Sequence, residues 1–292
     1  MYLIVISNSN GSFTIGSHKK MELTQIKGIG VPPKSTKTIE FTNVPGVTTT
    51  SVKDNSRTIS IAGDFYGTRK DVENIYRVIS DECEIRFIIG TERLMIRGRC
   101  INPDDIERIC NGFYSFVLQF TCDFPYFEDF YITKVSVKNR INQFPNTKDD
   151  EGWFITLPAV ATERTTESII VNRGAMSVYP VITISNMAEI APYSRARGII
   201  HIVNDRGGDI TLYHDFQVGE YVVLDLENRE IYSVTAEGTK TEITADISDD
   251  TVLSDFKLVP GENHISVQTE NTSNNISCFV EYKNLYCGVS LL

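Results

Sequence analysis

The feature that most constrains this chain is a two-residue alternation of apolar and polar side chains, which recurs along most of its 292 residues. In the stretch FYSFVLQFTC, residues 113–122, large apolar residues occupy alternate positions, with Ser115, Gln119 and Thr121 on the other face. Side chains of a β-strand point to opposite faces in turn, so this pattern is typical of a half-buried strand. The chain is therefore expected to be mainly β.

One segment has a helical period instead. Thr68 followed by Asp71 forms the pattern of a capping box, in which side chains satisfy the free backbone N–H groups of a first helical turn. The apolar residues that follow are spaced at i, i+3, i+4 and i+7 and form one stripe: Val72, Ile75, Tyr76 and Ile79. This predicts a helix over about residues 68–80, in a first half that is otherwise a β-sheet domain.

Turn residues divide the first half into strands. Asn10-Gly11 and Gly90-Thr91 each predict a hairpin between two alternating segments. The stretch from residue 28 to 53 is rich in glycine, proline and threonine, which excludes a helix. It is expected to form short edge strands or an extended arm.

Charge and polarity indicate two domains. Residues 1–150 hold 19 Lys and Arg against 18 Asp and Glu, a balance of +1, whereas residues 151–292 hold 9 against 20, a balance of −11. A polar stretch at 136–152 is predicted to be a linker between a domain at 1–135 and a β-sandwich at 153–292, for which a jelly roll is one topology that fits the pattern. The acidic second half argues against nucleic-acid binding.

The sequence offers no membrane segment, because no window approaches the roughly 18 apolar residues that a membrane helix needs. The opening MYLIVIS lacks a basic start and predicts a strand rather than a signal peptide. The six cysteines form no CxxC pair, so reduced thiols, and synthesis in a reducing cytoplasm, are expected.

The search for chemistry predicts no catalytic residues, no metal and no cofactor. No GxSxG elbow is present, and the four histidines form no recognisable pair with a nucleophile. His214-Asp215 could begin a metal site, but no second histidine follows at a useful spacing, and a position at the edge of a hairpin is preferred. The protein is therefore not expected to be an enzyme.

Aromatic residues gather where the strand at 113–122 ends. Phe124, Pro125, Tyr126 and Phe127 are candidate contacts between subunits or domains, because aromatic residues are enriched at such contacts. A loop folded back on its own core is an alternative of nearly equal weight. Trp153, the only tryptophan, is expected to pack at the domain junction.

The succession of motifs resembles the distal tail (Dit) protein family of bacteriophages. No single motif is specific, but their order along most of the chain carries the resemblance. The motifs are GIGVPP, SRTISIAGDFYG, FYSFVLQFTCDFPYFED, NRGAMSVYPVITISN, GEYVVLDLENREIYSV and FKLVPGENHISV. The resemblance implies a tail-tube-like first domain that closes into a six-fold ring and a galectin-like or carbohydrate-module-like second domain.

The implied function is structural: a hub joining the tail tube to the tail tip or baseplate of a virion, with receptor-binding proteins as further partners. In such a ring, the segment 28–53 could pair with a neighbouring subunit's sheet. The alternative is host recognition by the sandwich, with Tyr193, Tyr213 and Tyr286 as candidate contacts to cell-wall saccharide. A wall-degrading hydrolase is the third hypothesis. A complete phage and a phage-derived bacteriocin both remain open.

Overall fold

A computed structural model of the chain has two compact units. The first comprises residues 1–131 together with 285–292, and the second comprises residues 132–284. The residues that the structure describes are 2–41, 45–102, 106–138, 166–186, 198–217, 219–270 and 276–290.

The observed division differs from the predicted one in two places, because the chain passes between the units twice. Strand β12, Thr133–Lys138, pairs with β21, Ile276–Tyr282, and so belongs to the second unit. The last strand, β22, Leu285–Tyr286, returns to the first unit and pairs with β11, Phe127–Asp129. Most of the predicted linker, from residue 139 on, lies outside the described residues.

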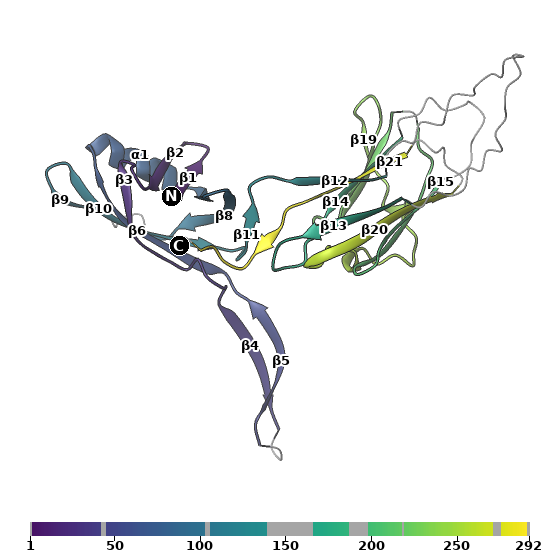
Figure 1. The fold of residues 1–292 in the computed structure, drawn as a ribbon, viewed down its shortest axis with the longest axis horizontal. Coiled ribbons are helices and arrows are strands. Elements are labelled where there is room, and N and C mark those ends of the chain that lie inside the picture. The colour runs from purple at the N-terminus through teal and green to yellow at the C-terminus, as the bar shows by residue number, and fades with distance from the viewer. Residues whose placement is uncertain are drawn as a thin grey trace, which may run out of the picture. The chain divides into compact units, whose positions relative to one another are not determined.

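The first unit is built on one ten-stranded sheet, in the order β22-β11-β8-β7-β1-β2-β3-β6-β10-β9 (Figure 1). An additional pairing of β8 with β10 closes the sheet formed by the seven strands from β8 to β10. The remaining strands of this sheet are β1 Tyr2–Asn8, β2 Gly11–Gly16, β3 Met21–Lys27, β6 Arg57–Tyr66, β7 Glu82–Ile89, β8 Glu92–Cys100, β9 Ile106–Cys110 and β10 Phe113–Cys122.

The predicted alternation is confirmed in this sheet. Strand β10 pairs with β6 along ten residues, and both strands turn alternate side chains inward. Phe116, Leu118 and Phe120 of β10 are buried against Ile59 and Ile61 of β6. The predicted hairpins around Asn10-Gly11 and Gly90-Thr91 are also present, as β1–β2 and β7–β8.

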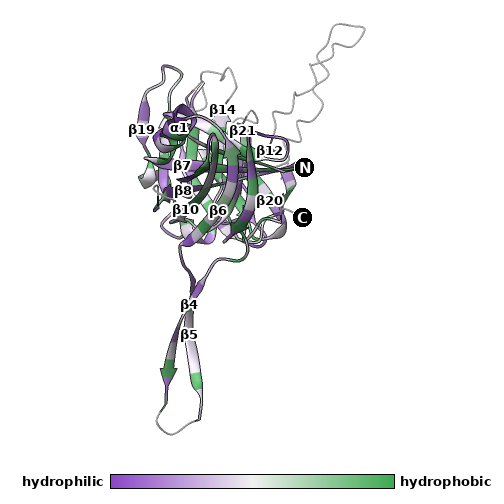
Figure 2. Ribbon diagram, turned by 90° about the vertical axis from the view of Figure 1, so that its left-hand side faces the viewer, coloured by the Kyte–Doolittle hydropathy of each residue, from purple (hydrophilic) through white to green (hydrophobic). Residues whose placement is uncertain are grey.

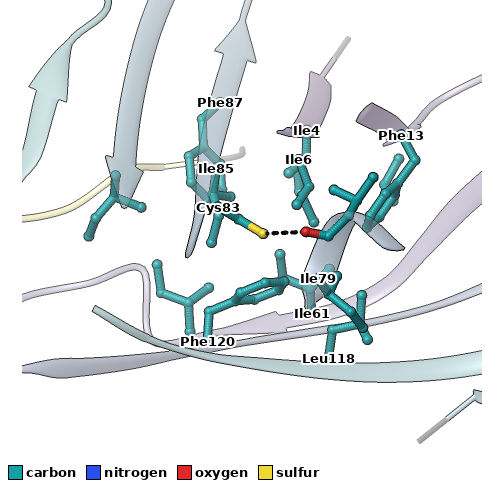
Figure 3. Close-up of a cluster of buried hydrophobic side chains, with 14 of the residues drawn as sticks. Ile4, Ile6, Phe13, Ile61, Ile79, Cys83, Ile85, Phe87, Leu118 and Phe120 are labelled. Carbon is teal, nitrogen blue, oxygen red and sulfur yellow. Dashed lines mark hydrogen bonds between the residues drawn. The ribbon is translucent and has the colours of Figure 1, made fainter. Parts of the chain in front are cut away.

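Helix α1, Arg69–Ile79, covers part of the core and confirms the predicted helix. Its buried side chains lie with those of β1, β6, β7 and β10 (Figure 3). The Cys83 thiol donates to the carbonyl of Val78 at 3.1 Å. Burial raises the pKa of Cys83 to about 12, so this thiol stays protonated and unreactive.

The second unit contains two sheets of antiparallel strands, in the orders β12-β21-β14-β17-β18-β19 and β13-β20-β15-β16. Together with the first unit they confirm the predicted mainly β fold. The remaining elements are β13 Thr166–Asn172, β14 Val181–Asn186, β15 Gly198–Asn204, β16 Gly208–His214, β17 Tyr221–Asp225, β18 Glu230–Val234, β19 Lys240–Glu242, β20 Gly261–Glu270 and the 3₁₀ turns η1 Thr244–Asp246 and η2 Leu253–Asp255.

His214 lies at the end of β16, between two carboxylates. The position at the edge of a hairpin that the sequence predicted does not include these partners. Its Nδ1 is 2.7 Å from Asp246 and its Nε2 is 3.1 Å from Glu220. His214 and Glu220 are buried, and Glu220 also accepts a hydrogen bond from the backbone N–H of Gln217. The group joins β16, the loop that follows it and η1. Across the described residues, no cluster of three or more His, Cys, Asp or Glu is arranged to hold a metal ion.

Among the helices in the described part of the chain, none has both the length and the apolar composition needed to cross a bilayer.

Replacing Asp71 tests the helix cap. Hydrogen bonds from Lys20 and from the backbone and hydroxyl of Thr68 lower the pKa of Asp71 to about 2. Because this pKa is depressed, the stabilisation is present above about pH 4 and is lost as pH falls towards about 2. Asp71→Ala should therefore cost about 1 kcal/mol at neutral pH, and the difference should shrink in acid.

Denaturant unfolding of both proteins across this pH range measures the difference. Glu73→Ala, which removes an exposed ion pair with Arg69 on the same helix, is the control and should change stability by only a few tenths of a kcal/mol. A difference for Asp71→Ala that stays constant into acid would contradict the assigned role of its carboxylate.

Replacing His214 tests the buried group in the second unit. His214→Phe keeps a ring of similar shape but leaves the Glu220 carboxylate, which is 5% exposed, without its imidazole partner. The expected loss is about 2 kcal/mol, measured by calorimetric unfolding. The matched control is His264→Phe, since His264 meets Glu167 at an exposed site and its loss should cost less than about 1 kcal/mol. Equal effects would show that burial of the charged group does not matter.

Candidate assembly interface

A hairpin stands outside the closed sheet of the first unit. Strands β4, Lys34–Glu40, and β5, Val47–Asp54, pair only with each other and form a separate two-stranded sheet. Every residue in them is exposed except Asp54. Figure 1 shows the hairpin running away from the rest of its unit. The predicted arm is therefore present as a hairpin, in which each strand pairs with the other along one edge and keeps its second edge unpaired within the described chain.

The hairpin carries apolar side chains that nothing in the described chain covers. Ile39, Phe41, Val47 and Val52 are between 48% and 57% exposed. Hydrophobic segments near the outer end of the hairpin are visible in Figure 2. An isolated two-stranded hairpin is marginally stable in water. Ile39 pairs with Thr48 and Val47 with Glu40, so both faces of this hairpin carry an exposed apolar residue. These features make the hairpin the strongest candidate for an assembly surface.

The base of the hairpin is held by the aromatic segment after β10. The hydroxyl of Tyr126 donates a hydrogen bond to the carboxylate of Asp54, the last residue of β5. Burial, reinforced by this hydrogen bond, raises the pKa of Tyr126 to about 12, so the hydroxyl keeps its proton. The backbone N–H of Asn55 also donates to the carbonyl of Pro33, at 2.8 Å, which closes the two ends of the hairpin.

Arg57, the first residue of β6, connects the segment that precedes the hairpin to the C-terminal segment. One of its terminal nitrogens donates to the backbone carbonyls of Gly28 and Gly30, and the other donates to the backbone carbonyl of Cys287 at 2.6 Å. Its guanidinium lies 4.7 Å from the centre of the Phe127 ring. Burial lowers the pKa of this arginine, whose side chain is almost completely enclosed. In the sequence, Arg57 shares one face of a two-residue alternation with Ile59 and Ile61, and this pattern alone assigns it no role.

The segment that leads from β3 into the hairpin requires a glycine at position 28. Gly28 has a φ of +82°, and a Cβ there would lie 2.0 Å from the carbonyl oxygen of Thr58. Only glycine can adopt this conformation at this distance without strain. The next residue, Ile29, accepts a hydrogen bond from the backbone N–H of Val289 in the C-terminal segment. The hairpin base is thus fixed by residues from both ends of the chain.

The predicted contact residues lie in different surroundings. Pro125 and Phe127 are buried in the first unit, and Tyr126 is half-buried beneath the hairpin base. Phe124 is 45% exposed, and its ring makes an edge contact with that of Tyr126. Trp153 lies outside the described residues. The segment thus supports the hairpin, which exposes more apolar side chains than the segment itself.

Two of the three tyrosines predicted to contact saccharide lie in the described residues, one in each unit. Tyr213 is half-buried on β16 of the second unit, whereas Tyr286 lies in β22 of the first unit and packs against its core. Tyr193 lies outside the described residues. The prediction that placed Tyr286 on the sandwich missed the return of the chain to the first unit.

Comparison with known proteins bears on the whole chain. Residues 173–286 match the family described as siphovirus-type tail component, C-terminal domain. No curated protein matches the chain. The crystal structure of Dit (gp 19.1) of SPP1, described as a paradigm of the hub adsorption apparatus in phages infecting Gram-positive bacteria, is similar with a TM-score of 0.60. The two chains are 12% identical, over 96% of this chain and 98% of that one.

Two chains from the baseplate of phage p2 in its activated conformation are less similar. The structure with Sr has a TM-score of 0.44 and 9% identity, over 97% of this chain and 98% of that chain. The structure with Ca has a TM-score of 0.43 and 10% identity, over 96% and 97%. The family match over residues 173–286 and the fold shared with the SPP1 distal tail protein together confirm the resemblance stated from the sequence.

Proposed function

We propose that this chain is a structural hub of a phage tail, in which the first units of six copies form a ring that joins the tail tube to the tail tip or baseplate. The observation that carries the proposal is the β4–β5 hairpin, whose apolar side chains lie outside a sheet that is otherwise closed. A surface of this kind is stabilised when another chain covers it. The SPP1 hub has the same fold, which supports the assignment.

A ring requires that the hairpin of one copy meet a different kind of surface on the next copy. A hairpin on one copy meets a different surface on the next, so the interface is heterologous. Heterologous contacts close into a ring when the rotation between copies permits it, and otherwise give an open filament. The rigid base, set by Arg57 and Tyr126, supports the proposal because it limits the directions in which the hairpin can point.

The proposal assigns no reaction to the chain, and its role is geometric. The acidic second unit would project from the ring at the end of the virion tail, where it could hold receptor-binding proteins. Saccharide binding by this unit has no separate support, because the rings predicted for it are divided between two units.

Light scattering on the purified full chain tests the ring directly. The chain has a mass of 32.9 kDa, and the proposal predicts a species near six times that mass at high concentration. Replacing residues 36–52 by a short Gly-Ser turn should leave a folded monomer, since the hairpin contributes nothing to the buried core.

The control removes apolar surface elsewhere. Ile169→Ser with Val171→Ser changes two exposed residues of β13 in the second unit, and it should leave the ring intact. A wild-type chain that stays monomeric at every concentration, also with its tail partners present, would overturn the proposal. So would a ring that survives loss of the hairpin.

A further inference from the structure

We propose that residues 244–251 form a pH-sensitive cover over the open edge of strand β16, and that a doubly protonated His214 holds this cover in place. Loss of one ring proton as pH rises loosens the cover and exposes the strand edge. The inference concerns the second unit alone and does not depend on the proposed ring. It is carried by the position of β16 in its sheet, by the composition of the cover and by the hydrogen bonds of His214.

Strand β16 is an edge strand, because it stands last in the four-stranded sheet of the described residues. Such an edge presents N–H and C=O groups to other chains unless something covers it. The segment after η1 lies along this edge, where Ile247 forms an isolated bridge with Leu212 of β16. The backbone N–H of Ser248 donates to the carbonyl of Thr211 at 3.0 Å, and the N–H of Thr211 donates to the hydroxyl of Thr251 at 3.1 Å. These contacts satisfy backbone groups that an open edge would expose.

The cover is weakly packed. None of the residues 244–255, all of which the structure describes, is buried, whereas Ile243 and Phe256 on either side of them are buried. Segments with few buried contacts are those that open locally. This stretch carries four aspartates and no lysine or arginine. A positive charge on β16 therefore stabilises the closed position of the cover.

His214 supplies that charge at the end of β16. One ring nitrogen is 2.7 Å from Asp246 of η1, and the other is 3.1 Å from Glu220. Among the described residues, these carboxylates are the charged groups that contact the ring, and β15 places Gly198 opposite it. A neutral imidazole has one N–H and an imidazolium has two. Both ionised carboxylates therefore accept a hydrogen bond only when the ring is doubly protonated.

Loss of one ring proton breaks the contact with Asp246. The side chain of Glu220 is buried, whereas that of Asp246 is 26% exposed and can be hydrated. A buried carboxylate without a partner is the more costly of the two, so the remaining N–H stays on Nε2, facing Glu220. The carboxylate of Asp246 then faces a lone pair on Nδ1, and the two repel each other. The released proton passes to solvent, and the cover loosens at η1.

Hydrogen exchange of the full chain, resolved by residue, tests the cover. It is measured at about pH 5.5 and at about pH 9, on either side of the range in which histidine changes its charge. After correction for the intrinsic exchange rate, protection of the Ser248 amide should fall by roughly tenfold or more at the higher pH, because a charge-assisted hydrogen bond is lost. Amides of β20, in the interior of the same sheet, should keep their protection.

Asp246→Asn separates the proton of His214 from other effects of pH. An asparagine side chain accepts from an imidazolium through its oxygen and donates to a neutral imidazole through its amide group. Protection of Ser248 in this variant should therefore be the same at both pH values. The matched control is His264→Gln, which removes a histidine that meets Glu167 at an exposed site of the same sheet. It should show the same fall as the wild type. Thermal unfolding establishes that each variant is folded.

The results separate the cover from the ring. A fall in protection that disappears in Asp246→Asn and persists in His264→Gln establishes the cover. Equal protection of Ser248 at both pH values in the wild type overturns it, and so does a fall of the wild-type size in Asp246→Asn. The ring is tested by the mass of the assembly, so either result leaves the proposed function as it stands.

Discussion

The fold of the first unit depends on backbone pairing that closes its sheet. Strand β10 pairs with β6 along its whole length and with β8 near its own C-terminal end. The apolar faces of the seven strands from β8 to β10 therefore surround one core. Helix α1 packs against this core. Residues 34–54 lie outside this core and form the β4–β5 hairpin. The apolar residues on that hairpin therefore need another surface to cover them.

Arg57 links the closed sheet to the features proposed to act in assembly. A buried guanidinium is costly unless its charge is hydrogen-bonded, and here three backbone carbonyls accept from it. Two of them precede the hairpin and the third lies in the C-terminal segment. Phe127, from the aromatic segment after β10, packs against the same guanidinium. In the proposed hub, whose contact surfaces must be held at fixed angles, this shared anchor would hold the segment that leads into the hairpin.

Local patterns predicted the local structure well. The alternation in FYSFVLQFTC and the Thr68–Asp71 capping box each depend on residues within a few positions, and both are confirmed. The missed features all depend on distant residues. Arg57 and Cys287 are 230 positions apart, and the return of β22 to the first unit cannot be inferred from two residues, Leu285 and Tyr286. A lone arginine at an inward strand position was the one available signal for the anchor, since such a residue needs partners.

The central claim is that the first unit folds around a complete core, whereas the exposed apolar side chains of its β4–β5 hairpin are covered only when copies assemble. Hydrogen exchange of the hairpin amides, measured in dilute monomer and in concentrated protein, tests this claim most directly. The account predicts that residues 34–54 exchange rapidly in the monomer and become protected on assembly, while β6 and β10 are protected in both. Hairpin amides that exchange at the same rate in monomer and assembly would contradict it.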